Sequence, residues 1–124
     1  MLFSEWVKTV SSKIILVTGN HDVISPLKYE AINITLTDEW QIDSILLTHI
    51  PEMRDHVFNI SGHIHPGIRL KGLGKQFISV PCFVKKINQM ILPAFGTFTG
   101  KFIISPNKED QVFAITKDEV IRMD

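Results

Sequence analysis

The sequence predicts an α/β fold, a mixed β-sandwich flanked by helices, with a strand-rich C-terminal half. Three observations lead to this prediction. Short apolar runs of strand length recur from residue 13 onward, and turn-forming residues separate them. Apolar residues at helical spacing are clear only in the first ten residues. Polar residues of the kind that bind metals follow three of the apolar runs, as they do at strand ends in α/β sheets.

The first element is predicted as a helix over residues 2–10, because Leu2, Trp6 and Val10 share one face. A second, short helix is predicted over Ser25–Glu30. The other elements are predicted as strands from continuous or alternating apolar residues. They are Lys13–Val17, Ala31–Leu36, Ile42–Thr48, Val57–Ile60, Ile68–Leu70, Gln76–Phe83, Gln89–Leu92, Lys101–Ile104, Val112–Thr116 and Glu119–Arg122.

The composition indicates one soluble domain. A chain of 124 residues without a Pro/Gly-rich linker holds one domain at most, and 44% hydrophobic residues exclude disorder. The net charge is zero and no basic block is present, so the chain has no built-in electrostatic footprint for nucleic acid. Its single cysteine, Cys82, excludes an internal disulfide. No apolar run approaches a membrane span and the N-terminus lacks export features, so we expect a cytoplasmic protein.

Three loops carry the candidate ligands. Gly19–Asp22 (Gly-Asn-His-Asp) follows the first predicted strand, His49 ends the third, and Gly62–His65 (Gly-His-Ile-His) follows the fourth. Because sites gather at the carboxyl ends of strands, we expect these loops to meet in one crevice. Imidazole nitrogens and amide oxygens suit divalent ions such as zinc, manganese or iron.

The spacing in the last of these loops suits a metal site. Gly62 lets the backbone turn sharply, and His63 and His65, one residue apart, can reach two neighbouring positions. Ile64 between them is expected to point the other way and to anchor the loop in apolar contact.

The first loop offers a ligand, the Asn20 amide oxygen, and a catalytic group, His21, whose ring Asp22 is placed to orient. Taken singly, such residues have ordinary explanations. Asn and Gly form turns, and a lone histidine such as His49 is more often a surface residue, the interpretation kept for His56. A given four-residue string arises by chance on the order of once in 10⁵ positions. Two such strings in order, with a histidine between them, favour a shared site.

Together these motifs resemble those of the calcineurin-like metallophosphoesterases. That family carries, in order, Asp-x-His, Gly-Asp, Gly-Asn-His-Asp/Glu, a lone histidine and Gly-His-x-His, and this chain has the last three. The surrounding residues are similar to one branch, the bacterial ligase-associated DNA damage response endonucleases. The segments that carry this similarity are Leu47–Pro51, Ile60–Gly67, Pro81–Phe83, Leu92–Gly96 and Phe98–Gly100.

The resemblance implies a site for two divalent ions, manganese, zinc or iron. The implied ligands are Asn20, His49 and His63 for the second ion and His65 for the first. His21 is implied to act as general acid toward the leaving-group oxygen or to stabilise the charge of the phosphorane, with Asp22 orienting it. The implied substrate is a phosphodiester, DNA in that branch, and the implied partners are a DNA ligase and a helicase.

The chain departs from the family pattern before Gly19. Neither Asp-x-His nor Gly-Asp occurs there, and Glu5 is the only earlier acid. We therefore expect residues 1–124 to form a partial domain, the C-terminal two thirds, without its N-terminal strands and without the carboxylates that complete the two-metal site. Such a chain is expected to be inactive alone and to expose a sheet edge and an apolar face, favouring aggregation or a homo-oligomer. Either the gene continues upstream in frame, or the chain is a degenerate remnant.

Three functions stay open at this point. The leading hypothesis is a metal-dependent phosphodiesterase or endonuclease in DNA repair. The second is a catalytically inactive phosphoesterase-like binding module or gene remnant. The third is a mononuclear metal-binding protein of unrelated fold, which predicts one tightly held ion.

Overall fold

The computed structural model describes residues 3–19, 28–29, 31–72, 74–96 and 100–123. Within these ranges the chain forms one short helix and eleven strands. They are α1 (Phe3–Thr9), β1 (Ile14–Val17), β2 (Ile34–Thr37), β3 (Glu39–Ile42), β4 (Ile45–Thr48), β5 (Phe58–Ser61), β6 (Pro66–Lys71), β7 (Phe77–Lys85), β8 (Gln89–Ile91), β9 (Phe102–Ile103), β10 (Gln111–Ile115) and β11 (Val120–Met123).

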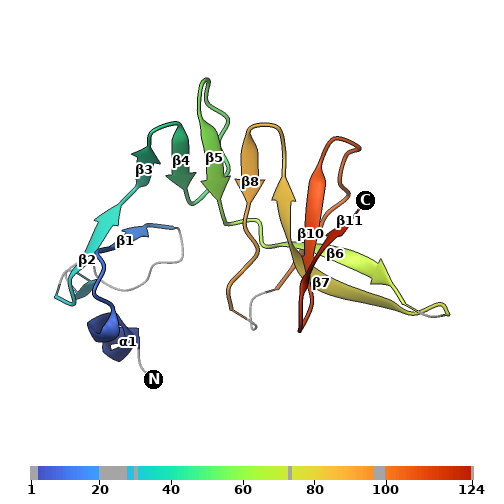
Figure 1. Cartoon of the computed structure of the whole chain (residues 1–124), viewed down its shortest axis with the longest axis horizontal. Helices are drawn as coiled ribbons and strands as arrows, with labels where there is room; N and C mark the ends of the chain where they lie inside the picture. Colours follow the sequence, from blue (N-terminus) through green and yellow to red (C-terminus); the bar gives the residue numbers. More distant parts are fainter. Residues whose placement is uncertain (1–2, 20–27, 30, 73, 97–99, 124) are drawn as a thin grey trace.

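The strands form a small and a large sheet. β1 and β2 pair in parallel, and the large mixed sheet has the order β11-β10-β7-β8-β5-β4-β3, with β6 and β9 joined to it through β7. Figure 1 shows this row of strands, with α1 and the β1–β2 pair next to its β3 end. Within the row, β4, β5 and β8 are mutually parallel neighbours. Their carboxyl ends therefore meet at one edge of the sheet.

The longest strand, β7, joins two parts of the sheet and carries the core. Its first half pairs with β6, and its second half lies between β8 and β10. The inward-facing Cys82 and Val84 of that second half are buried with Ile91 and Val112 from the two neighbouring strands. Burial raises the pKa of the Cys82 thiol to about 11, so this cysteine stays neutral and behaves as an apolar side chain.

Two predicted strands need correction, because each contains a residue with left-handed backbone. The predicted strand Ala31–Leu36 begins only at Ile34, since residues 31–33 form a turn and Asn33 has a φ of 64°. The predicted strand Ile42–Thr48 is interrupted by a two-residue turn in which Asp43 has a φ of 53°. Asn and Asp tolerate this backbone, which opens a tight turn between β3 and β4.

The predicted fold class is confirmed in its coarse part. The described residues are mostly β, in a mixed sheet, and most predicted strands are present with shifted ends. Of the predicted flanking helices, the described residues show α1, a seven-residue helix. Within the predicted helix Ser25–Glu30, Lys28 and Tyr29 have helical backbone, and the other residues lie outside the described part of the chain. No helix in the described part of the chain has the length and apolarity that a membrane crossing requires.

Candidate functional site

Two candidate ligands lie side by side at the common edge of the parallel strands. The register of β4 and β5 pairs Thr48 with Ser61, and the N–H of Gly62 donates to the carbonyl of His49 at 3.1 Å. This bond joins the two chain segments just beyond the ends of both strands. It places the backbone of His49 beside that of Gly62, and His63 is the next residue.

The imidazoles of His49 and His63 are in direct contact. His49 Nε2 and His63 Nδ1 are 3.2 Å apart, the ring centroids are 5.0 Å apart, and the ring planes meet at 70°. Both residues are half-buried. The edge-on arrangement brings one nitrogen of each ring within hydrogen-bonding distance of the other, and the two rings come from separate loops.

The Gly62–His65 loop holds an uncommon backbone. His63 and His65 have φ values of 70° and 55°, and the N–H of Ile64 donates to the Gly62 carbonyl at 2.8 Å. A hydrogen bond between residues two apart around a positive φ is a γ-turn of the strained kind, and left-handed non-glycine residues cost on the order of 1 kcal/mol each. Ile64 packs against the core cluster and offsets this cost, as predicted. Such strain concentrates at functional sites.

Gly19, the first residue of the Gly19–Asp22 motif after β1, lies against His49. A Cβ atom added to Gly19 would lie 2.7 Å from His49 Cε1 and Nδ1, closer than real contacts allow. The segment after β1 therefore reaches the histidine pair, which leaves no room at that position for a side chain. The candidate residues Asn20, His21 and Asp22 follow Gly19 in the sequence and lie outside the described residues.

His65 takes a different position from the pair. Its carbonyl accepts a hydrogen bond from the Phe102 N–H at 2.9 Å, which joins the loop to β9. Among the described residues, no three His, Cys, Asp or Glu side chains are grouped closely enough to hold a metal. The structure therefore brings together His49 and His63 and does not add His65 to them. His56 lies elsewhere, exposed, in the loop before β5.

The loop after His49 is held by buried amide side chains that sequence reasoning missed. Asn59 is 1% exposed, and its Nδ2 donates to the carbonyl of Leu46 at 3.0 Å and to Thr48 Oγ1 at 2.9 Å. The Glu52 N–H donates to Asn59 Oδ1 at 3.0 Å, and Gln89 Nε2 donates to the Glu52 carbonyl at 3.0 Å. An asparagine in the middle of an apolar run, as in Phe58–Ser61, was the available signal, since a buried amide needs partners.

The spacing of the two imidazole nitrogens fits a shared cation. His49 Nε2 and His63 Nδ1, 3.2 Å apart, are close enough that both could be ligands of the same zinc-sized ion. The pair alone supplies two neutral donors, so a complete centre needs further ligands, and a carboxylate is the group that would offset the charge.

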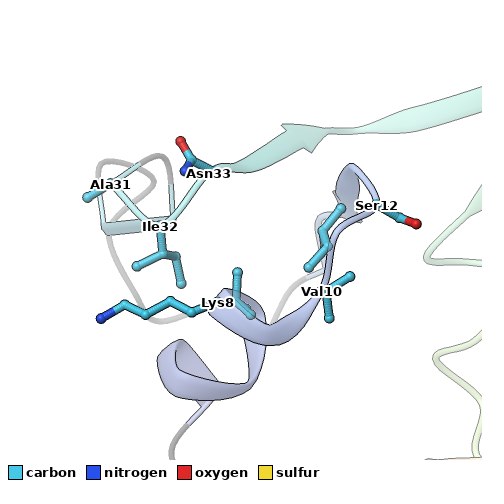
Figure 2. Close-up of a pocket in the computed structure, with 8 residues that line it drawn as sticks. Lys8, Val10, Ser12, Ala31, Ile32 and Asn33 are labelled. Atoms are coloured by element: carbon cyan, nitrogen blue, oxygen red, sulfur yellow. The ribbon is translucent and has the colours of Figure 1, made fainter.

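A separate hollow of about 340 Å³ lies between α1 and the turn before β2. Figure 2 shows Lys8 and Val10 on the helix side and Ile32, from the turn, directed toward them. Of the described residues that line it, none is a histidine, a cysteine or a carboxylate. Its described lining therefore lacks the histidine, cysteine and carboxylate ligands that metal sites most often use.

One solved structure matches almost the whole chain. It is the crystal structure of Pseudomonas putida nuclease MPE, with a TM-score of 0.80 and 29% sequence identity. The match covers 97% of this chain and 59% of that one, so this chain spans less than two thirds of the nuclease. No family profile matches the sequence, and a search of curated proteins found no match.

Proposed function

We propose that this chain carries part of the active site of a metal-dependent phosphodiesterase that cleaves nucleic acid. The observation that supports this most directly is the His49–His63 pair, whose nitrogens are 3.2 Å apart at the ends of adjacent parallel strands. The fold that positions the pair is shared with a solved nuclease. A histidine pair in an unrelated fold would support only metal binding.

In this proposal His49 and His63 hold one divalent cation, manganese, zinc or iron, together with Asn20, and His65 serves a second. When bound, such ions neutralise phosphate oxygens and acidify water for attack on phosphorus. The strained γ-turn at His63 supports its role, since the loop holds the imidazole against His49 at a cost in backbone energy. Gly19 supports it too, because the missing side chain leaves the His49 ring in place.

The proton-transfer role is proposed for His21. Its imidazole would deliver a proton to the leaving-group oxygen, and Asp22 would hold the ring in the protonated form. This assignment rests on the Gly19–Asp22 motif and on the position of Gly19 beside His49. DNA is the proposed substrate, by analogy with the nuclease that shares the fold.

The proposal is tested first by metal binding in the 124-residue chain. When Mn²⁺ is mixed with the chain, we expect its free-ion electron paramagnetic resonance signal to decrease because the ion binds. In His63→Gly, which lacks one imidazole of the pair, the free-ion signal should return. The matched control is His56→Gly. His63 and His56 both have positive φ, 70° and 66°, so a glycine relieves similar backbone strain at either position. Only His63→Gly removes an imidazole of the His49–His63 pair. Equal Mn²⁺ binding in the two variants would contradict the assignment of His63.

Hydrolysis is tested separately with bis-p-nitrophenyl phosphate and Mn²⁺. Any turnover is expected to be low, because no group of three metal-binding side chains forms among the described residues, and to disappear in His63→Gly but not in His56→Gly. Metal binding without turnover would instead favour the second candidate, a phosphoesterase-like module that binds nucleic acid without cleaving it. The observation that favours this alternative is that, among the described residues, the two imidazoles form no group with a third metal-binding side chain.

A further inference from the structure

The hairpin of β6 and the first half of β7 projects from the sheet as a two-stranded arm. Figure 1 shows this arm extending away from the rest of the sheet, on the side opposite β3. Phe77 and Ile78 near its tip are each 57% exposed, and Arg69 and Lys71 are exposed as well. Because a two-stranded ribbon is only marginally stable by itself, an open edge on this arm is a place where a further strand can pair.

The charges of the chain are segregated along the sequence, and the arm lies in the basic part. Residues 56–108 hold seven Lys and Arg and no Asp or Glu. The other residues hold all thirteen Asp and Glu with six Lys and Arg, so they carry the opposite excess. In the described part of the chain neither Arg69 nor Lys71 forms an ion pair with a carboxylate. The Arg69 guanidinium lies instead over the Phe77 ring, 5.8 Å from its centroid.

The opposite edge of the sheet, at β3, is acidic. Among the described residues β3 pairs with β4 alone, and all four of its residues are exposed. Asp38 precedes this strand, Glu39 begins it and Asp43 follows it. Arg54 Nη2 lies 2.6 Å from Glu39 Oε2 and 2.7 Å from Glu52 Oε2. One guanidinium thus faces two carboxylates, which leaves a net negative charge at this edge.

The backbone of β6 has free hydrogen-bonding groups on the side away from β7. The Gly67 carbonyl accepts a hydrogen bond from the Ile104 N–H at 2.9 Å on that side, where β9 lies. Successive residues of a strand direct their N–H and C=O groups to alternate sides, so Arg69 and Lys71 direct theirs to the same side as Gly67. β9 pairs with β6 at Pro66 and Gly67 only. In the described residues the backbone groups of Arg69 and Lys71 therefore have no strand beside them.

The backbone of β3 has free groups at matching positions. Its two-residue turn to β4 closes on Ile42 and Ile45, and the pair next to such a turn is the hydrogen-bonded kind. Gln41 and Glu39 lie one and three residues before Ile42, so they direct their N–H and C=O groups away from β4, toward the open edge.

One antiparallel register joins these free groups and suits both faces of the two strands. It sets Lys71 opposite Glu39, and Arg69 opposite Gln41. On the other face it brings apolar side chains together, Ile68 and Leu70 of β6 with Ile42 and Trp40 of β3. A shift of one residue would set apolar side chains opposite charges and leave the free backbone groups unmatched.

From these observations we propose that the β6 edge of one copy of this chain pairs with the β3 edge of a second copy, in the register that sets Lys71 opposite Glu39. The occupant of each edge is then the opposite edge of another copy, so the contact runs head to tail. Opposite charges and apolar side chains in cross-strand pairs stabilise such a contact. This goes beyond the proposed function and does not depend on the metal site.

The test is sedimentation velocity of the 124-residue chain over a range of concentrations, at low salt and in EDTA. We expect the sedimentation coefficient to rise with concentration. Lys71→Glu and Glu39→Lys should each raise the dissociation constant about tenfold, because each sets like charges opposite each other. Both changes in one chain should restore association, and so should an equimolar mixture of the two single variants, because a cation again faces a carboxylate.

Lys117→Glu is the matched control. It makes the same change of charge in the exposed turn between β10 and β11, so association should stay unchanged. Restored association in the doubly changed chain would show that the single variants are folded.

Three results would overturn the proposal: a chain that is monomeric at every concentration, a Lys71→Glu variant that associates like the unaltered chain, or a doubly changed chain that stays dissociated. A Lys71→Glu variant that associates normally but binds a labelled oligothymidylate more weakly would overturn it too, since the arm would then contact nucleic acid. Because no metal is present, failure of Mn²⁺ uptake or of hydrolysis contradicts the proposed function alone.

Discussion

Gly19 and His49 show how closely single residues are matched in this site. The glycine backbone lies against the imidazole ring with no space for a methyl group, and the same ring contacts His63 through Nε2. Any displacement of the His49 ring therefore alters the distance between the two nitrogens. Three strands, β2, β3 and β4, lie in the sequence between this glycine and the histidine that it contacts.

We expect Gly19→Ala to break the His49–His63 contact, because a Cβ atom 2.7 Å from the ring forces it to move. Mn²⁺ binding should fall to the level of His63→Gly, and the imidazole nitrogen resonances of both histidines should shift in ¹H–¹⁵N spectra. Gly62→Ala is the control, since an added Cβ there has no atom within 4 Å. Similar spectra for Gly19→Ala and the unaltered chain would show that the ring adapts without cost.

At the scale of elements, the site depends on how the ends of β4 and β5 are held. Three hydrogen bonds from the Asn59 side chain connect β5 to the Leu46 carbonyl, the Thr48 hydroxyl and the Glu52 N–H. Thr48 Oγ1 in turn donates to the Ile50 carbonyl at 2.7 Å. These hydrogen bonds hold the chain both before and after His49. The end of β4 is therefore fixed at the position of this candidate ligand.

We expect Asn59→Ala to lower the free energy of unfolding by about 2–4 kcal/mol, because it leaves buried polar groups without partners. Gln41→Ala removes a comparable bond, from Gln41 Nε2 to the Asp43 carbonyl at 2.9 Å, but in an exposed turn. Its cost should stay near 0.5 kcal/mol, on the order typical of surface changes. Urea denaturation measures both, and equal losses would mean that burial of the network adds nothing.

At the scale of the whole molecule, the sheet leaves apolar surface and edges exposed. β3 pairs only with β4, so in the described residues its outer edge has no neighbour, and Trp40 and Ile42 on it are exposed. Ile45, opposite Ile42 in the β3–β4 pairing, is 39% exposed on the same face of the sheet. Open edges and apolar faces favour association with further chain.

We expect the 124-residue chain to self-associate as its concentration rises, in size-exclusion chromatography with light scattering. Ile45→Lys should shift the population toward monomer, because a charge on that face opposes its burial. Met53→Lys is the control, since Met53 is 73% exposed in a loop and not on the sheet. A monodisperse monomer at all concentrations, melting cooperatively, would count against this expectation.

Much of the fold could be predicted because the period of apolar residues is a local property. The strands β4, β5, β7, β8 and β10 lie where continuous or alternating apolar runs placed them. The breaks at Asn33 and Asp43 could not be placed that way, because a left-handed residue inside a strand-like run leaves no trace in the apolar period. The buried Asn59 also escaped, since its partners come from segments 7–13 residues away.

The sequence by itself determined which residue types are available for a site and that they follow strands: Gly19–Asp22, His49 and Gly62–His65. Only the tertiary structure decided that His49 and His63 touch. The physical reason is register. Parallel pairing between β4, β5 and β8 is set by hydrogen bonds among segments distant in sequence, and a slip of one residue would turn each of these side chains to the other face.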